Sequence, residues 1–123
     1  MKEIVSKLVT KEEEMAQEKG QFHLFALFLR EDSPDKWDVV VAAPWINKDK
    51  DAALKYMASK IQTSLNRDEL MKLSRIVIID DENPALDAVQ RGVHIEHGSV
   101  EIQNSLFFGL NIKHAYLITS IKG

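Results

Sequence analysis

The sequence comprises 123 residues, of which 45% are hydrophobic and 28% charged, with a formal net charge of -3 at pH 7. One globular domain spanning residues 1–123 is expected at this length, and the acidic balance gives no basis for binding nucleic acid. The absence of cysteine excludes disulfide frameworks, thiolate nucleophiles and Cys-ligated metal centres.

Membrane insertion and export are not expected either. No apolar stretch reaches the roughly 20 residues that a membrane-spanning helix needs. Charged residues interrupt the apolar positions that follow Met1, so no signal-peptide core is visible. The sequence therefore predicts a cytoplasmic protein that does not associate with membranes.

The N-terminal segment is expected to be helical, because apolar residues recur near helical spacing up to a stop signal at Gly20. Residues 10–13 resemble a capping box that restarts or reinforces the helix. We therefore interpret the run Glu12 to Glu14 as the acidic first turn of a helix, where carboxylates complement the helix dipole, rather than as an interaction patch.

Two apolar runs follow, residues 22–29 and 37–43, and the polar stretch between them contains Pro34. This arrangement predicts an antiparallel hairpin. Both runs are apolar at nearly every position instead of alternating, which is typical of strands covered on both faces in the middle of a sheet.

Apolar residues at spacings of three and four over residues 54–65 predict a helix with Asn47 as its N-cap. A second capping signal at residues 66–69 predicts a short extra helix. The β-branched run 76–79 then predicts a buried strand. A strand, a helix and a strand in this order imply a parallel crossover.

A short helix from Pro84 to Gly92 and strands near residues 93–102, 105–110 and 114–121 complete the chain. The predicted fold is α+β, or loosely α/β, with a mixed sheet of five to six strands and helices on both faces. The expected element order is α-β-β-α-(α)-β-α-β-β(-β).

The first candidate site lies where the parallel strands end, because ligands in open α/β sheets bind outside the carboxyl ends of the strands. Its candidate ligand-binding residues are Trp45, Asn47, Asp80, Asp81 and Asn83, and its candidate metal ligands are Asp80, Asp81 and Glu82. Clustered carboxylates suit Mg²⁺ or Mn²⁺, and a helix N-terminus suits a small anionic ligand. The simpler alternative is that residues 80–83 form a polar loop that caps the next helix, so no cofactor is assigned.

The second candidate site is His94 with Glu96. Alternation along a strand would place these two side chains on one face and His97 on the other. A histidine and a carboxylate on the same face can share a metal ion or form an oriented base. Solvent-facing polar residues of a strand are the alternative.

Several enzyme signatures are absent, among them the phosphate-binding loop, the dinucleotide-binding turn, the nucleophile elbow and the acid-x-Lys element of restriction-enzyme-like nucleases. Phe107 and Phe108 would form an apolar interface patch with Trp37 or Trp45 if one of them faced outward, whereas a covered strand would bury both. The edge of the C-terminal strand would also suit pairing with a second copy.

These observations favour a non-catalytic binding, regulatory or protein-interaction module that forms a homodimer. A different protein or a small anion is the other kind of partner that we consider. The alternative function is a metal-assisted hydrolase or phosphoryl-handling enzyme that uses residues 80–83.

Overall fold

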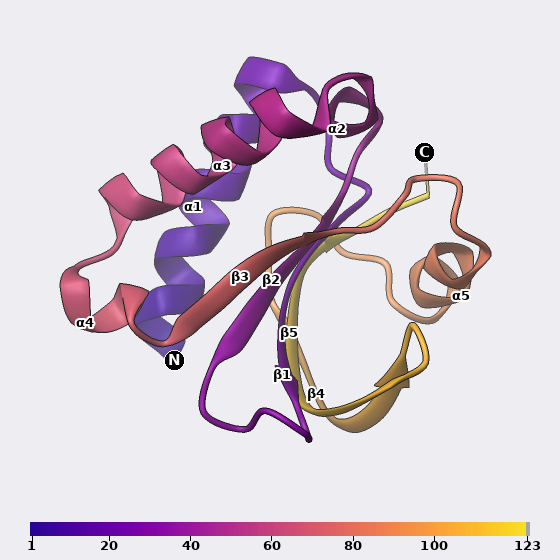
Figure 1. Cartoon of the computed structure of the whole chain (residues 1–123). Helices are drawn as coiled ribbons and strands as arrows, with labels where there is room; N and C mark the ends of the chain where they lie inside the picture. The colour runs from indigo at the N-terminus through magenta and orange to yellow at the C-terminus, as the bar shows by residue number, and fades with distance from the viewer. Residues whose placement is uncertain (123) are drawn as a thin grey trace.

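The computed structural model describes residues 1–122 and shows one β-sheet with helices on both faces (Figure 1). In chain order the elements are α1 (Lys2–Lys19), β1 (Leu24–Arg30), β2 (Trp37–Ala42), α2 (Pro44–Lys48), α3 (Lys50–Ser64), α4 (Arg67–Leu70), β3 (Leu73–Ile78), α5 (Pro84–Gly92), β4 (Val100–Phe107) and β5 (Leu110–Ser120). The predicted α+β class is confirmed. Within residues 1–122, no helix is long and apolar enough to cross a membrane.

The five strands form a mixed sheet in the order β3-β2-β1-β5-β4. β1 and β2 form the predicted antiparallel hairpin, and β2 and β3 run parallel, as the strand-helix-strand order predicted. β1 lies in the middle of the sheet, and every residue of β2 is buried. The uninterrupted apolar sequences of these two strands therefore fit their place between two helical layers.

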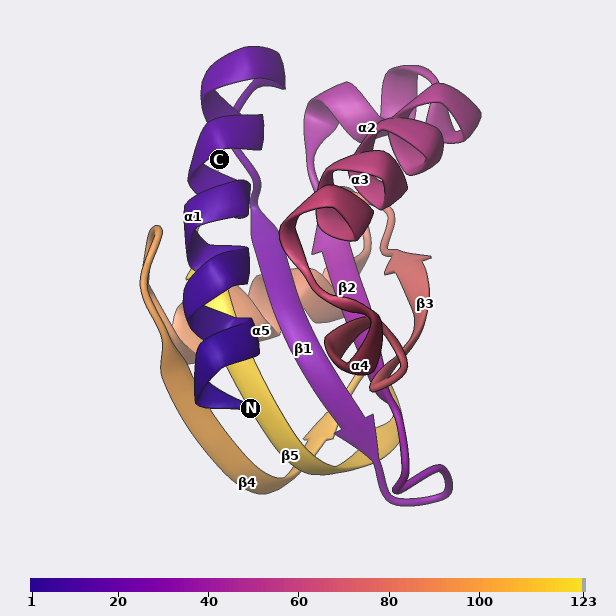
Figure 2. The same cartoon turned by 90° about the vertical axis from the view of Figure 1, so that its left-hand side faces the viewer.

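Side-chain alternation along β1 lets one strand contribute to two cores. Phe25 and Leu27 belong to the cluster that α1 and α3 cover, whereas Leu24, Ala26 and Phe28 belong to the cluster beneath α5. Figure 2 shows α1 and α3 side by side in front of the sheet and α5 behind it. The prediction that helices cover both faces is confirmed.

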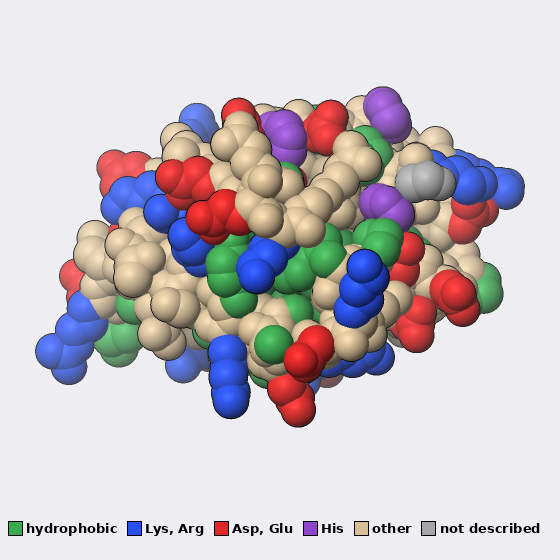
Figure 3. All heavy atoms as spheres, turned by 90° about the horizontal axis from the view of Figure 1, so that it is seen from above, with side chains coloured by type: hydrophobic (Ala, Val, Ile, Leu, Met, Phe, Trp, Pro, Cys, Tyr) green, Lys and Arg blue, Asp and Glu red, His purple; other side chains and the backbone are tan. Residues whose placement is uncertain are grey.

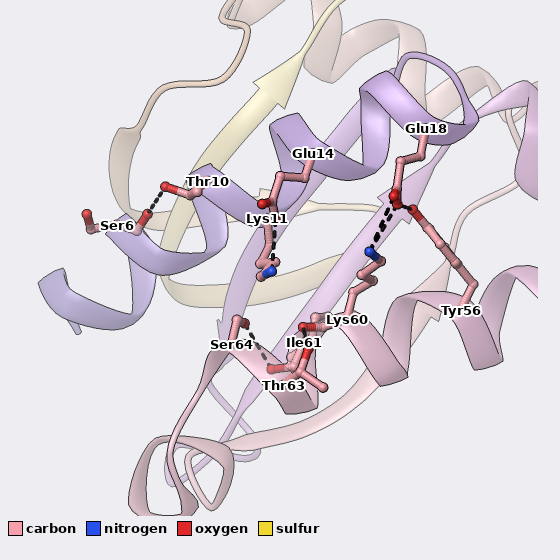
Figure 4. Close-up of polar contacts among 10 residues, drawn as sticks. All are labelled: Ser6, Thr10, Lys11, Glu14, Glu18, Tyr56, Lys60, Ile61, Thr63 and Ser64. Atoms are coloured by element: carbon pink, nitrogen blue, oxygen red, sulfur yellow. Dashed lines mark hydrogen bonds and ion pairs between the residues drawn. The ribbon is translucent and has the colours of Figure 1, made fainter.

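Polar side chains join α1 to α3 at the rim of their shared core (Figure 4). Glu18 of α1 accepts a hydrogen bond from the Tyr56 hydroxyl and another, at 3.4 Å, from the Lys60 ammonium group of α3. Burial raises the pKa of the Tyr56 hydroxyl, and the Glu18 carboxylate raises it further, so Tyr56 remains a donor. These bonds link the two helices across the rim of the layer.

α1 is one continuous helix, and the predicted capping box over residues 10–13 is wrong. The Thr10 hydroxyl donates to the Ser6 carbonyl one turn earlier, at 3.4 Å, instead of capping a new helix (Figure 4). Glu12 consequently lies in the middle of α1, and its side chain is fully buried. The interpretation of Glu12 as part of an acidic first turn is therefore also wrong.

The start of the central helix also differs from the prediction. The short helix α2 occupies residues 44–48, and the chain is extended at Asp49 before α3 begins. The Asp49 carboxylate caps α3 by accepting a hydrogen bond from the Ala52 backbone N–H at 3.1 Å. Asn47 lies inside α2 and does not cap α3.

The C-terminal part of the described chain forms two strands where three were predicted. Residues 93–99 form no strand and contain a bend over residues 96–98 and one isolated bridge between Ile95 and Ser120. Phe108 and Gly109, both with positive φ, form the tight turn between β4 and β5. Since β5 lies between β1 and β4, the C-terminal strand has no open edge for a second copy.

The neighbouring aromatic residues of β4 and its turn contribute to the core beneath α5. Phe107 is buried and stacks on Phe28 with ring centroids 5.0 Å apart, and Phe108 packs beside the same ring. Trp37 is buried on the opposite face. Phe107 is therefore buried, as the alternative of a covered strand predicted, whereas Phe108 in the turn is half-buried.

Candidate functional site

The acidic loop, residues 80–83, follows β3 and caps α5. Asp80 accepts a hydrogen bond from the Glu82 backbone N–H at 2.9 Å, and the Asn83 side chain accepts one from the first turn of α5. Asp81 lies 2.6 Å from the Nδ1 atom of His23, beside a cavity of about 210 Å³. Asp80 and Asn83 therefore make local contacts, as the capping alternative predicted, whereas Asp81 contacts a distant residue.

Trp45 and Asn47 do not join the acidic loop. Trp45 packs edge-on against Phe22 and Tyr56, at centroid distances of 5.4 and 6.0 Å, in the core shared by α1 and α3. The Nε1 atom of Trp45 and the Oδ1 atom of Asn47 are buried without a hydrogen-bond partner among the described residues. Because α2 begins soon after β2 ends, Trp45 packs into this core. It does not line the cavity beside Asp81.

The predicted magnesium or manganese ligands Asp80, Asp81 and Glu82 do not converge. Within residues 1–122, no group of three or more His, Cys, Asp or Glu side chains is placed to hold a metal ion. The positions of these carboxylates therefore do not support the hypothesis of a metal-assisted enzyme.

The second candidate pair is arranged differently from the prediction, because residues 93–99 do not form a strand. His97 has a left-handed backbone with φ of 53°, which turns the chain at this point. His94 is exposed, and Glu96 lies 3.8 Å from the Nε2 atom of His97 while accepting a 2.6 Å hydrogen bond from Gln21. Glu96 thus pairs with His97 and not with His94. Figure 3 views the upper end of the molecule and shows histidine side chains among acidic ones.

A buried polar network that the sequence analysis missed connects α1, β5 and the segment before β4. The two carboxylate oxygens of Glu12 contact the Nδ1 atom of His97 at 2.5 Å and the hydroxyl of Thr119 at 2.8 Å. The His97 backbone N–H donates to the same hydroxyl at 3.1 Å. Glu12 and Thr119 are fully buried, so each polar group of the network has its partner inside the protein.

Burial raises the pKa of the Glu12 carboxyl above its usual range, although His97 and Thr119 lower it in part. For His97, burial lowers the pKa of the imidazole, but the hydrogen bond and charge of Glu12 outweigh this effect, and the net pKa is raised.

One signal in the sequence could have revealed the network. Glu12 lies four residues after Leu8 and three before Met15, inside the apolar stripe of α1.

β3 lies at one edge of the sheet and has β2 as its only hydrogen-bonded strand neighbour within the described chain. The Ile79 N–H donates to the Val41 carbonyl of β2 at 2.8 Å. Because alternate residues of a parallel strand bond to the same neighbour, Val77 also faces β2 while Ile76 and Ile78 direct their N–H and C=O groups outward. These outward groups are free to pair with another strand.

The β3 edge borders an apolar groove of about 480 Å³. The groove is lined from β2, α3, α4 and β3 by Val39, Leu54, Ala58, Ile61, Gln62, Leu70, Leu73, Ser74, Arg75 and Ile76. Leu54 is 39% exposed although its side chain is apolar. We call the outward backbone groups of β3 together with this groove the β3 edge surface. Figure 2 shows β3 beside α3 at the margin of the sheet.

The opposite edge strand, β4, is protected along its length, whereas β3 has a charged residue, Arg75, and a register shift only at its start. β4 has alternating polar residues, including Glu101, and the left-handed Asn104 interrupts its edge. Charges and local backbone irregularities of this kind discourage pairing with another strand. The second half of β3 and the residue after it, Ile76 to Ile79, are apolar and β-branched throughout.

Comparisons with protein-family models, with curated proteins and with solved structures find no match to this chain.

Proposed function

We propose that this chain is a non-catalytic protein-interaction module that binds its partner at the β3 edge surface. The observation that carries the proposal is the contrast between the two edges of the sheet. β4 has charge and a backbone irregularity in its middle, whereas the charge of β3, Arg75, and its register shift both lie at its start, and the second half of β3 is an uninterrupted β-branched run next to an apolar groove. An unprotected edge strand of this composition pairs readily with another strand.

Binding at this surface would extend the sheet by one strand. An extended segment of the partner would bond to the backbone groups of Ile76 and Ile78, and these main-chain bonds would supply affinity. Alternate side chains of the added strand would enter the groove near Leu54, which would supply specificity. No catalytic group is needed for this function.

Photo-cross-linking tests the proposal, because it captures whichever protein occupies the groove. A photoreactive phenylalanine analogue replaces Leu54 in the groove, and a matched control replaces Leu106 on β4, which is 67% exposed against 39% for Leu54. In cells of the source organism, we expect discrete protein adducts at Leu54 and several-fold fewer at Leu106. The proposal fails if Leu54 gives no more adducts than Leu106, because the control site is the more accessible one.

A further inference from the structure

We infer that the partner at the β3 edge surface is a second copy of this chain, which pairs its own β3 in the antiparallel direction; this inference rests on the function proposed above. Two five-stranded sheets would then join into one continuous sheet around a two-fold axis between the β3 strands. The inference depends on three observations, which concern the burial, the charge and the pairing geometry of β3.

The first observation is that the second half of β3, Ile76 to Ile78, has the composition of an interior strand but lies at the edge of the sheet. A run that is apolar at every position is typical of a strand covered on both sides, and β2, which has such a run, is fully buried. None of the residues of β3 is buried, and Ile76, Val77 and Ile78 are only half-buried. Pairing with a second β3 would place this run in the middle of a sheet, where its composition fits.

The second observation is that the two ends of β3 have opposite charges. Lys72 precedes the strand and Arg75 lies near its start, whereas Asp80 and Glu82 follow its end, and all four side chains are exposed. Antiparallel self-pairing places the basic end of each copy beside the acidic end of the other. Parallel pairing would instead place like charges together. The charges along β3 therefore favour an antiparallel second copy.

The third observation is the pairing geometry. The outward residues Ile76 and Ile78 can only pair with outward residues of the other copy. The register that places Ile76 opposite Ile78 puts Val77 on the two-fold axis and points Lys72 of each copy toward Glu82 of the other. In this arrangement the α3 helices of both copies lie on the same face of the joined sheet. The half-exposed Leu54 of each copy would then be covered by the second copy.

Analytical ultracentrifugation of purified full-length chain tests the inference. We expect a reversible dimer for the wild type and for the control Leu106→Glu, and a monomer for Leu54→Glu, with circular dichroism confirming that each variant is folded. Leu54 is on the surface of a helix, so glutamate there is compatible with the monomer fold.

Charge reversal tests the register. Lys72→Glu should weaken dimerisation roughly tenfold, because it affects two symmetry-related pairs, and the double variant Lys72→Glu with Glu82→Lys should restore the affinity. A dimer that survives Leu54→Glu, or a double variant as weak as the single one, would overturn the inference.

The two proposals can fail separately. A monomer at every concentration, combined with cross-linking of a different protein at Leu54, would refute self-pairing and leave the interaction module standing. A monomer that also gives no adducts at Leu54 above the Leu106 level would refute both.

Discussion

Replacing Glu12 with glutamine tests how strongly the buried network stabilises the fold. Hydrogen bonds to charged groups contribute roughly 1.5–3 kcal/mol each, and Glu12 makes two, with His97 and with Thr119. Glutamine keeps the shape and one acceptor but loses the charge, and the lower cost of burying a neutral amide offsets part of the loss. We expect the free energy of unfolding to fall by about 2 kcal/mol, which lowers the melting temperature by roughly 6–10 °C in a domain of this size.

The same variant should change how stability depends on pH. The pKa of His97 is raised in the folded protein, so the native state binds more protons than the unfolded state once the pH exceeds about 6.5. The stability from this histidine is fully present below that pH and is lost as the pH rises through the folded pKa. The raised pKa of Glu12 has the same sign and acts from about pH 4.5 upward. Stability from the pair therefore decreases between pH 6 and pH 8.

Urea unfolding of the wild type and of Glu12→Gln at several pH values between 6 and 8 measures both effects. The other histidines are present in both proteins, so the difference between the two curves isolates the Glu12–His97 pair. We expect the difference in unfolding free energy to be largest at pH 6 and to shrink toward pH 8. A difference that is constant with pH, or that grows toward pH 8, would refute the raised pKa of His97.

Three further predictions concern the buried hydroxyl, the cap of α3 and the acidic loop. Thr119→Val removes the hydroxyl that Glu12 and the His97 backbone share, so chemical denaturation should show a loss of roughly 1–3 kcal/mol, and an unchanged midpoint would contradict the burial of this network. Asp49→Ala removes the cap of α3 and should lower stability by roughly 0.5–2 kcal/mol in the same assay, whereas Asn47→Ala should have a smaller effect; the opposite order would mean that Asn47 is the cap. Thermal melts with saturating Mg²⁺ or Mn²⁺ should show no shift, and a shift abolished by Asp80→Asn would restore the metal-assisted enzyme hypothesis.

Periodicity and turn chemistry in the sequence were sufficient for much of the fold. The hairpin of β1 and β2, the parallel β2–β3 pair and the helices on both faces all follow from apolar spacing and from the turn around Pro34. One error occurred where two local signals compete. Asn47 and Asp49 are both good caps, and the structure uses the one at which the chain is extended. Near the C-terminus, positive φ at His97 replaces a predicted strand with bends, which alternation alone does not reveal.

The sequence by itself determined the class of the fold, the identity of its central strands and the capping role of the acidic loop, because each depends on residues close together in the chain. Tertiary structure alone decided that Glu12 meets His97, 85 residues away, and that Asp81 meets His23. It also decided that β3 occupies an edge although the composition of its second half is that of an interior strand. The physical reason is that local patterns report how much of an element is buried, whereas the partner that buries it depends on how distant elements pack.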